Sequence, residues 1–443
     1  MKNSKSGSDP AAAGEKPDTL LKAAFSAVGC KLNQYEVQAI AEALAPYGFI
    51  ETPFNTRADL YIINTCTVTG KADYTSRQMV RRALRKNPEA KVIVTGCYAQ
   101  LEPDAIKELG DIASVVGNAS KDTIPEIALK MFDIPYDGAP SCGIITTMSS
   151  HSRAFIKIQE GCVEKCTYCI IWRARGRPQS REPEQIINEI NNLAENGYHE
   201  VVLTGVHIGK YKKRLNLTGL LKAIFKDTDM HHIRLSSLKP NEFNDKLIQL
   251  IADEKRLCPH VHLPIQSGDD SVLSRMGRKY KASLVSGLAN RLIEARPDMT
   301  IGADFIVGFP GESEANFENS VALVRNNPIH RLHVFSYSDR PGTPASEFPD
   351  KVAPEDKAKR SRRLRRIGSE KIKKHSQAFV GRTLDVIVED RQKSGLLTGV
   401  SGNYLKVQFP GDEKLRKKHI SIKILSVDRD ILIGDPGSIG IIE

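Results

Sequence analysis

The segment GCVEKCTYCII contains three closely spaced cysteines and no fourth cysteine near them. Cys162, Cys166 and Cys169, here called the barrel cysteines, follow the apolar stretch AFIKIQ, which has the pattern of a buried strand. A structural zinc ion takes four protein ligands, and the other candidates, His260 and His262, belong to a different strand pattern. Four-iron clusters usually take four cysteines, so three thiolates leave one iron open to another ligand. The segment therefore favours an iron–sulfur cluster with one open iron over zinc.

A second set of three cysteines stands earlier in the chain, each just beyond a predicted strand. Cys30 follows AFSAVG, Cys66 follows YIINT and Cys97 follows VIVTG, and we call them the N-terminal cysteines. Because the carboxyl ends of parallel strands meet at one edge of a sheet, thiols that are far apart in sequence can converge there. The sequence therefore predicts a second metal site at this edge.

The order of predicted strands and helices indicates an α/β protein in three parts. Alternating β-branched runs and helical segments over residues 20–133 predict an N-terminal parallel α/β sheet domain. Six strand–helix units over residues 148–377 predict a partial (β/α)6 barrel, an incomplete version of the eight-unit barrel. Residues 378–443 have short strands broken by Gly, Asn and Pro, which predicts a small all-β barrel or sandwich. The polar residues 1–19 are expected to be a disordered tail.

The composition favours a cytoplasmic protein with a polyanionic partner. The net charge of +11 indicates nucleic acid, although some housekeeping enzymes are basic without such a partner. The chain begins without the apolar region of a signal peptide, and no apolar run is long enough to cross a bilayer, so we expect no membrane association. In a reducing compartment the eight cysteines are expected to be ligands or free thiols. Cys142 and Cys258 belong to neither set and are expected to be ordinary buried thiols.

Two basic segments each have two interpretations. A predicted helix places Arg77, Arg81 and Arg85 on one stripe, which is either a solvated face or a contact to phosphate. The run KAKRSRRLRRIGSEKIKK, residues 357–374, is either a segment that contacts RNA or the solvated side of a barrel helix. The sequence leaves both choices open.

The cysteine spacing resembles that of a known superfamily. CxxxCxxC after the first strand of a partial β/α barrel, with Tyr168 before the last cysteine, resembles the radical S-adenosylmethionine superfamily. A three-cysteine domain before such a barrel and a small β domain after it resemble the methylthiotransferases, from about residue 22 onward. The segments VGCKLNQYE, INTCTVTGKADYTSRQ and VTGCYAQ are similar to the branch that acts on threonylcarbamoyladenosine in tRNA.

This resemblance implies a tRNA-modifying enzyme with two [4Fe–4S] clusters and S-adenosylmethionine as cofactors. The cluster on the barrel cysteines would cleave S-adenosylmethionine to a 5′-deoxyadenosyl radical, and the cluster on the N-terminal cysteines would carry sulfur. The implied reaction inserts a methylthio group at C2 of N6-threonylcarbamoyladenosine at position 37, immediately 3′ of the anticodon. The implied partners are the tRNA anticodon loop and an electron donor such as flavodoxin or ferredoxin. The C-terminal region resembles the TRAM-like RNA-binding module.

The resemblance also implies the contacts of S-adenosylmethionine, at predicted strand ends in LTGVHIG, LSSL, LPIQSGDD and DFIVGFPGE. The expected cofactor-binding residues are Tyr168, Thr204, Gly205, Ser237, Gln266, Ser267 and Asp304. A glycine after a strand is also typical of an ordinary turn. The motifs RMGRKY and SYSDRPGT resemble family signatures too, with a salt-bridged rim as the alternative.

Other functions are compatible with the same features. A methylthiotransferase that acts on isopentenyladenosine in tRNA, or on an aspartate of a ribosomal protein, would keep both clusters. An iron–sulfur RNA-binding regulator without turnover would keep the basic helices and the terminal β domain. Trp172 and Arg173 stand where the family usually has Pro-Tyr, which puts rate and substrate preference in doubt more than the type of chemistry.

Overall fold

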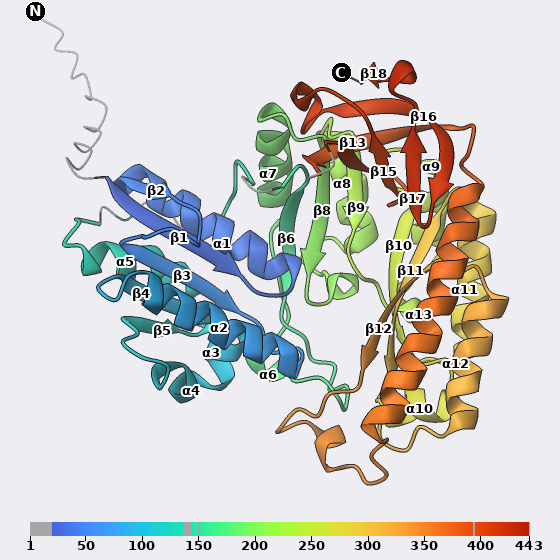
Figure 1. The fold of residues 1–443 in the computed structure, drawn as a ribbon, viewed down its shortest axis with the longest axis horizontal. Coiled ribbons are helices and arrows are strands. Elements are labelled where there is room, and N and C mark those ends of the chain that lie inside the picture. The colour runs from blue at the N-terminus through green and yellow to red at the C-terminus, as the bar shows by residue number, and fades with distance from the viewer. Residues whose placement is uncertain (1–19, 137, 139–142, 149–150, 393–394, 443) are drawn as a thin grey trace, which may run out of the picture.

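A computed structural model describes the chain from residue 20 to residue 442, apart from 137, 139–142, 149–150 and 393–394. Figure 1 shows an N-terminal sheet with its helices, a central curved sheet with helices on its outer side, and a small β-barrel at the C-terminus. The predicted α/β fold in three parts is therefore confirmed. The predicted disordered tail and Cys142 lie outside the described residues.

The N-terminal part is a parallel sheet of five strands. In spatial order the strands are β2 (Phe49–Glu51), β1 (Leu21–Ala27), β3 (Leu60–Thr65), β4 (Lys91–Gly96) and β5 (Ser114–Val116). Every residue of β3 is buried, as expected for a central parallel strand with helices on both faces. The helices are α1 (Lys31–Leu44), α2 (Gly70–Lys86), α3 (Cys97–Leu101), α4 (Pro103–Lys107) and α5 (Ile124–Met131), with 3-10 turns η1 (Ala45–Tyr47) and η2 (Asn118–Thr123).

The central part has the six predicted parallel strands, β6 (Ala154–Glu160), β8 (Glu200–Gly205), β9 (His232–Leu235), β10 (His260–Gln266), β11 (Thr300–Val307) and β12 (Arg331–Ser336). Outside them lie α7 (Pro183–Glu195), α8 (Leu217–Asp227), α9 (Asp245–Asp253), α11 (Ala282–Ala295), α12 (Glu314–Asn326) and α13 (Pro354–Gln377). Short elements sit in the connections: α6 (Ile171–Arg175), β7 (Gln179–Ser180), η3 (Ile208–Lys210), η4 (Pro240–Glu242), α10 (Asp270–Arg275) and η5 (Pro344–Glu347).

The barrel differs from a continuous sheet because its ladder is interrupted between β9 and β10. Proline has no N–H to donate, and Pro259 stands immediately before β10. Isolated hydrogen bonds join this region instead, such as Leu238 N–H to the His262 carbonyl at 3.0 Å. Pro264 lies within β10, where the register to β11 shifts and Gln266 adopts a φ of +74°. The six strands therefore belong to two hydrogen-bonded sheets, one containing β6, β8 and β9 and the other β10, β11 and β12.

The N-terminal sheet is fixed to the barrel through α1. One apolar core includes buried residues of α1, such as Ile40, and of β6, such as Ile156. At its edge the Tyr35 hydroxyl donates to Glu189 of α7 at 3.0 Å, and Arg181 forms an ion pair with the same carboxylate at 2.5 Å. This packing fixes how the carboxyl edge of the N-terminal sheet faces the barrel.

The basic segment of residues 357–374 lies within α13, the last barrel helix. Arg360 forms an ion pair with Glu312 at 2.8 Å, and Arg363 pairs with Glu318. The Lys371 ammonium donates to the carbonyls of Val324 and Asn327 at the end of α12. These contacts favour the barrel-helix interpretation for the inward part of the segment.

The C-terminal part is a closed β-barrel rather than a sandwich. The strand order is β13 (Thr383–Arg391), β14 (Leu397–Ser401), β15 (Lys406–Phe409), β17 (Ile431–Gly434), β16 (His419–Asp428) and β18 (Gly440–Ile441), with turns η6 (Glu413–Leu415) and η7 (Pro436–Ser438). An additional pairing of β13 with β16 closes the ring. This barrel packs on the amino ends of the central strands, where the Tyr404 ring lies 4.5 Å from the ring of His260, the first residue of β10. It therefore lies at the end opposite to the cysteines.

We expect Asp269→Ala to destabilise the protein by about 1 kcal/mol at pH 7, since Asp269 caps α10. Its carboxylate accepts the N–H groups of Ser271 and Val272, each at 3.0 Å, and the Asn319 amide at 2.7 Å. Burial opposes the charge, but these hydrogen bonds lower the pKa of Asp269 to about 2. The stabilisation is therefore complete above pH 3.8 and is lost as the pH falls toward 2.

Urea unfolding of the apoprotein at pH 7 and at pH 3 measures this difference. The gap between wild type and Asp269→Ala should shrink at the lower pH, and a gap that widens would contradict the role of the cap. Asp111→Ala, at an exposed aspartate, is the matched control and should change little at either pH.

None of the helices in the described part of the chain is both long enough and apolar enough to span a membrane.

Candidate functional site

The barrel cysteines occupy the loop between β6 and α6, at the carboxyl end of the first barrel strand. The Glu164 N–H donates to the Cys162 sulfur at 3.3 Å, and His207 beyond β8 places Nδ1 3.8 Å from the same sulfur. Burial, together with the neighbouring thiols of Cys166 and Cys162, raises the pKa of Cys169 to about 11. The three thiols are thus close enough to influence one another.

The motif RMGRKY supports this loop from behind. The Thr167 N–H donates to the Met276 carbonyl at 3.1 Å, and the Arg278 guanidinium donates to the Tyr168 hydroxyl. A Cβ at Gly277 would lie 3.7 Å from the Cys166 Cα, so the two segments pack backbone to backbone. The motif therefore positions the cysteine loop. This role differs from that of a salt-bridged rim, which was the alternative interpretation of the motif.

The N-terminal cysteines follow three neighbouring strands, β1, β3 and β4, as the sequence predicts. Cys66 and Cys97 are buried, whereas Cys30 is exposed at the start of α1. Burial, together with the thiols of Cys30 and Cys97, raises the pKa of Cys66 to about 12. The expected convergence at the carboxyl edge of the sheet is present.

Glycines before two of these cysteines allow the loops to approach one another. Gly29 has a φ of +93°, and a Cβ there would lie 2.6 Å from the Cys66 sulfur. Gly96 has a φ of +101°, and its Cβ would lie 2.3 Å from the Thr65 carbonyl oxygen. Only glycine adopts such conformations without strain in this space. Glycine is therefore required in the segments VGC and TGC because the strand ends lie so close together.

Arg175 connects the central barrel to the site of the N-terminal cysteines. It lies in α6, six positions after Cys169, and its Nε stands 3.3 Å from the Cys97 sulfur. The same guanidinium forms ion pairs with Glu36 of α1 at 2.7 Å and with Glu160 of β6 at 2.6 Å. Its side chain is only 1% exposed. A single buried cation therefore joins the N-terminal sheet, the barrel strand and the sulfur site.

Glu36 and Asn33 complete this buried network. The Lys121 ammonium also pairs with Glu36, and Asn33 Oδ1 accepts a hydrogen bond from Arg175 Nη2 at 2.6 Å. Burial opposes the charge of Glu36, but Arg175 and Lys121 hold its pKa far below its usual value. The Asn118 amide approaches the Cys97 sulfur from another side, at 3.9 Å. The sequence analysis missed these residues, although Asn33, Glu36 and Arg175 stand within six positions of a predicted ligand.

A cavity of about 210 Å³ lies beside the barrel cysteines. It contains three of the predicted cofactor-binding residues, Tyr168, Gln266 and Asp304. His262 Nε2 lies 2.8 Å from the Asp304 carboxylate and His333 Nδ1 lies 3.4 Å from it. Burial opposes ionisation, yet these contacts hold the pKa of Asp304 well below its usual value. The cavity therefore presents a fixed carboxylate beside an amide and a phenol.

The other four predicted contacts stand outside the lining of this cavity. Thr204 and Gly205 end β8, and a Cβ at Gly205 would lie 2.5 Å from the Gln159 carbonyl. Ser237 is exposed beyond β9, and the buried Ser267 hydroxyl lies 3.4 Å from that of Ser320 on α12. Their role at the cofactor remains a prediction.

A second cavity, of about 230 Å³, lies between the two cysteine sets. Thr67, Tyr98 and Ile170, which line it, each directly follow a cysteine of one set or the other. The charged lining residues are Arg77, Arg173, Arg340, Asp73 and Glu102. Arg340, from SYSDRPGT, pairs with Asp73 at 2.7 Å, whereas Arg173 is exposed and contacts the Gly342 carbonyl at 3.4 Å. The neighbouring Trp172 lies under the Lys165 ammonium, 5.6 Å from the centre of its ring.

The donor atoms fit two polynuclear clusters better than single zinc ions. Among the described residues, three groups of His, Cys, Asp or Glu side chains have ligand atoms within 4.8 Å of one another, as a single metal ion requires. Neither cysteine set is one of these three groups. Two thiolates on one zinc ion stand at most about 4.6 Å apart, given zinc–sulfur bonds of about 2.3 Å. N–H groups of Arg175, Asn118 and Glu164 point at cysteine sulfurs, as occurs around iron–sulfur clusters. Each set thus offers three thiols and a polar surround.

Comparison with known proteins places this geometry in a class. Residues 22–117 match the model of "Uncharacterized protein family UPF0004", and residues 156–324 match that of the Radical SAM superfamily. The fold is similar to that of the radical S-adenosylmethionine methyltransferase TsrM from Kitasatospora setae, with a TM-score of 0.54, 16% identity and 74% of each chain covered. The class is therefore that of proteins with a radical SAM domain.

Full-length relatives narrow the class to a family. The chain is 36% identical to the threonylcarbamoyladenosine tRNA methylthiotransferase MtaB of Bacillus subtilis, over 91% of this chain and 93% of the relative. It is 35% identical to the protein of the same name from Aquifex aeolicus, over 90% and 98%. It is 33% identical to a tRNA-2-methylthio-N(6)-dimethylallyladenosine synthase of Ehrlichia canis, over 92% and 97%. The chain belongs to the methylthiotransferase family of radical SAM proteins.

Proposed function

We propose that this protein inserts a methylthio group at C2 of N6-threonylcarbamoyladenosine in tRNA, next to the anticodon. The observation that carries the proposal is the pair of three-cysteine sets, each at the carboxyl ends of strands in one of two packed sheets, with Arg175 of the central barrel reaching Cys97 of the N-terminal set. The relatives from B. subtilis and A. aeolicus that match over nearly their whole length bear the name of this activity.

In this proposal the barrel cysteines hold a [4Fe–4S] cluster that binds S-adenosylmethionine, and the N-terminal cysteines hold a second cluster. When bound, these groups would supply the electron that cleaves S-adenosylmethionine and the sulfur that is transferred. Tyr168, Gln266 and Asp304 would orient the cofactor from the 210 Å³ cavity. No side chain is needed as a general base, because the C2 hydrogen of adenine is not acidic. The contribution of the protein is to align the reactants and exclude water.

The cavity between the cysteine sets favours a substrate that carries a carboxylate. Arg77, Arg173 and Arg340 line it, and Arg173 is the exposed one of the three. The threonylcarbamoyl group has a carboxylate, whereas the isopentenyl group is uncharged. A guanidinium binds a carboxylate through two parallel hydrogen bonds. Asp73 and Glu102 also line the cavity, and Arg340 is paired with Asp73. It is therefore the exposed Arg173 that supports the threonylcarbamoyl substrate over the isopentenyl one.

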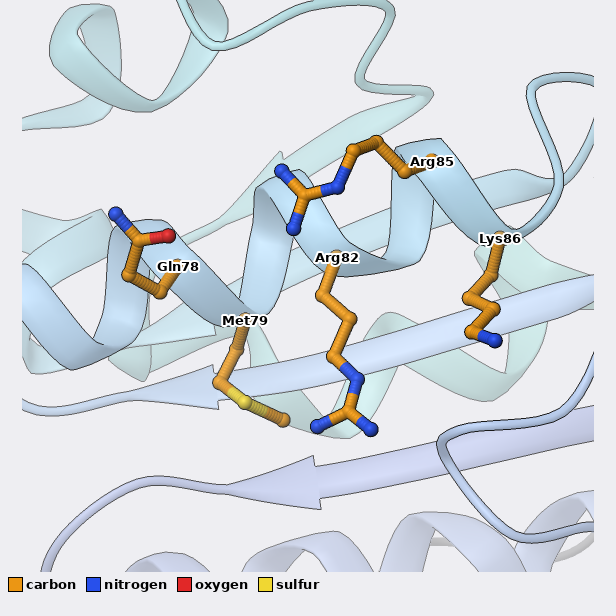
Figure 2. A pocket seen from close by; sticks show the side chains of 5 residues that line it. All are labelled: Gln78, Met79, Arg82, Arg85 and Lys86. Carbon is orange, nitrogen blue, oxygen red and sulfur yellow. The ribbon is translucent and has the colours of Figure 1, made fainter.

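The basic side of α2 is suited to the phosphates of the tRNA. Figure 2 shows Arg82, Arg85 and Lys86 projecting from the C-terminal half of this helix, with Gln78 and Met79 about one turn before them. All three cations are exposed. On the predicted stripe, Arg77 differs because it donates to the Tyr98 hydroxyl at 3.0 Å. We infer that the exposed part of α2 contacts the sugar–phosphate backbone, which attracts such clusters without regard to sequence.

The test is a reconstitution with two tRNA substrates. The chain, reconstituted anaerobically with iron and sulfide, should bind about eight irons if both clusters have four. With S-adenosylmethionine and a reductant it is then given tRNA that carries unmodified threonylcarbamoyladenosine, or tRNA that carries unmodified isopentenyladenosine. Mass spectrometry of the nucleosides should find the methylthio group on the first substrate.

Each failure of this test has its own meaning. Four irons, or bound zinc at either cysteine set, would contradict the two-cluster proposal. Methylthiolation of the isopentenyladenosine tRNA alone would move the substrate to the other branch. An absence of 5′-deoxyadenosine would favour an RNA-binding regulator. An untouched tRNA pool together with a modified ribosomal-protein aspartate would indicate the third branch.

A further inference from the structure

A cluster of histidines lies where the C-terminal barrel packs on the amino ends of the central strands. His232 is the first residue of β9, and His419 is the first residue of β16. Their ring centres are 4.8 Å apart, and those of His231 and His199 are 5.4 and 5.7 Å from that of His419. This group is at the end of the barrel opposite to both cysteine sets.

His419 is buried without a hydrogen-bond partner. Its relative exposure is 3%, and neither of its ring nitrogens is satisfied by any of the described residues. Nδ1 of His232 is likewise buried without a hydrogen bond, and it lies 3.9 Å from the Glu200 carboxylate. Buried polar atoms are nearly always paired, so the unpaired imidazole nitrogens of His419, beside the ring of His232, call for a ligand.

Asp385 adds a carboxylate to this group. In the ladder of β13 and β16, Asp385 is opposite Ser421 and Ile387 is opposite His419. Residues two apart on a strand share a face, so Asp385 and His419 are diagonal neighbours on one face of the barrel wall. Asp385 is exposed, which leaves a route from solvent to the group.

We propose that His232, Asp385 and His419 bind a zinc ion that fastens the C-terminal barrel to the central barrel. One ligand atom from each of the three residues lies within 4.8 Å of the other two. Nitrogen and oxygen ligands on a tetrahedral zinc ion stand about 3.3 Å apart, given bonds of about 2.0–2.1 Å, so the three side chains rotate toward the ion when it binds. The fourth position is filled by His231 or by water. Imidazole with one carboxylate suits zinc and excludes magnesium and calcium, which prefer oxygen ligands alone.

A neighbouring group of potential ligands, Glu200, His232 and Cys258, is less suited to a metal ion. The Glu200 carboxylate is already held by Arg234 at 2.6 and 2.9 Å. Cys258 is buried beside the same arginine, and burial raises the pKa of its thiol to about 12. Because Arg234 occupies the Glu200 carboxylate and lies beside Cys258, a metal ion is better bound by the group that contains Asp385 and His419.

Zinc binding is measured on the reconstituted protein, so that iron and sulfide already occupy the cysteines. After equilibrium dialysis against micromolar zinc, elemental analysis should find one zinc per chain while the iron content is unchanged. His419→Gln and Asp385→Asn should each lose at least about ten-fold in zinc affinity. His151→Gln, which changes a histidine far from this cluster in the sequence, should retain the zinc.

A second measurement separates binding from misfolding. Zinc should raise the melting temperature of the wild type and of His151→Gln but not that of Asp385→Asn, because a ligand that binds only the folded state stabilises it. Asp385 is exposed, so its variant should fold without metal. Zinc that is absent from the wild type, or that binds wild type and Asp385→Asn equally, would overturn the proposal.

Discussion

Arg175→Leu is expected to remove the cluster that we propose for the N-terminal cysteines, while the barrel cysteines keep the cluster proposed for them. The iron content should fall from about eight to about four per chain, and the yield of methylthiolated nucleoside should fall about 100-fold. Formation of 5′-deoxyadenosine should continue, because the Arg175 guanidinium contacts Cys97 and none of the barrel cysteines.

The physical reason is an excess of buried negative charge. The Arg175 guanidinium pairs with Glu36 and Glu160 and stands 3.3 Å from the Cys97 sulfur. Without it, Glu36 keeps Lys121 as its partner in an ion pair, and Glu160 keeps Lys157. Iron binding then places three negatively charged thiolates beside two carboxylates, Glu36 and Glu160, that have each lost one of their positively charged partners. Loss of a single buried partner typically costs about 3–5 kcal/mol.

Two further variants make the result specific. Arg175→Lys keeps the charge but loses the planar fork that reaches Glu36, Glu160 and Asn33 together, so its iron content and yield should be intermediate. Arg177→Leu changes an exposed arginine two positions further on and should match the wild type. The positioning role would be wrong if Arg175→Leu retained eight irons and full product yield.

The convergence of Cys30, Cys66 and Cys97 could be predicted because it depends on topology alone. Strands that alternate with helices form a parallel sheet, and parallel strands bring their carboxyl ends to one edge. The same argument placed the barrel cysteines at the end of β6. Short strands and frequent turns, which require local sequence information only, predicted the small all-β domain at the C-terminus but left open whether it is a barrel or a sandwich. The pairing of β13 with β16 decides for the barrel.

Contacts between the parts could not be predicted in this way. Arg175 meets Cys97 because α1 packs on β6, and no periodicity in the sequence specifies that packing. His232 and His419 meet for the same kind of reason. The direction of a side chain at a strand end is also not fixed by pattern: Gln266 lines the cavity, whereas the Ser267 hydroxyl turns toward Ser320.

Glu200→Gln is expected to cost about 3–5 kcal/mol of unfolding free energy, the largest stability effect that we predict. Glu200 is fully buried, and its two carboxylate oxygens accept hydrogen bonds from Arg234 at 2.6 and 2.9 Å. Arg153 lies 3.6 Å from the same carboxylate. A neutral amide would leave the Arg234 guanidinium, which is 2% exposed, without a counterion in the interior.

The same change should loosen the C-terminal barrel, since Arg234 also donates to the Ser401 carbonyl and stacks over the Tyr404 ring at 4.8 Å. Urea unfolding followed by circular dichroism measures the cost, with Glu195→Gln on the exposed end of α7 as a control that should stay within about 0.5 kcal/mol of wild type. The double variant Glu200→Gln/Arg234→Met should be more stable than Glu200→Gln alone, because it removes the uncompensated charge together with its partner. A double variant less stable than the single one would show that the packing of Arg234, rather than its pairing with Glu200, holds this junction together.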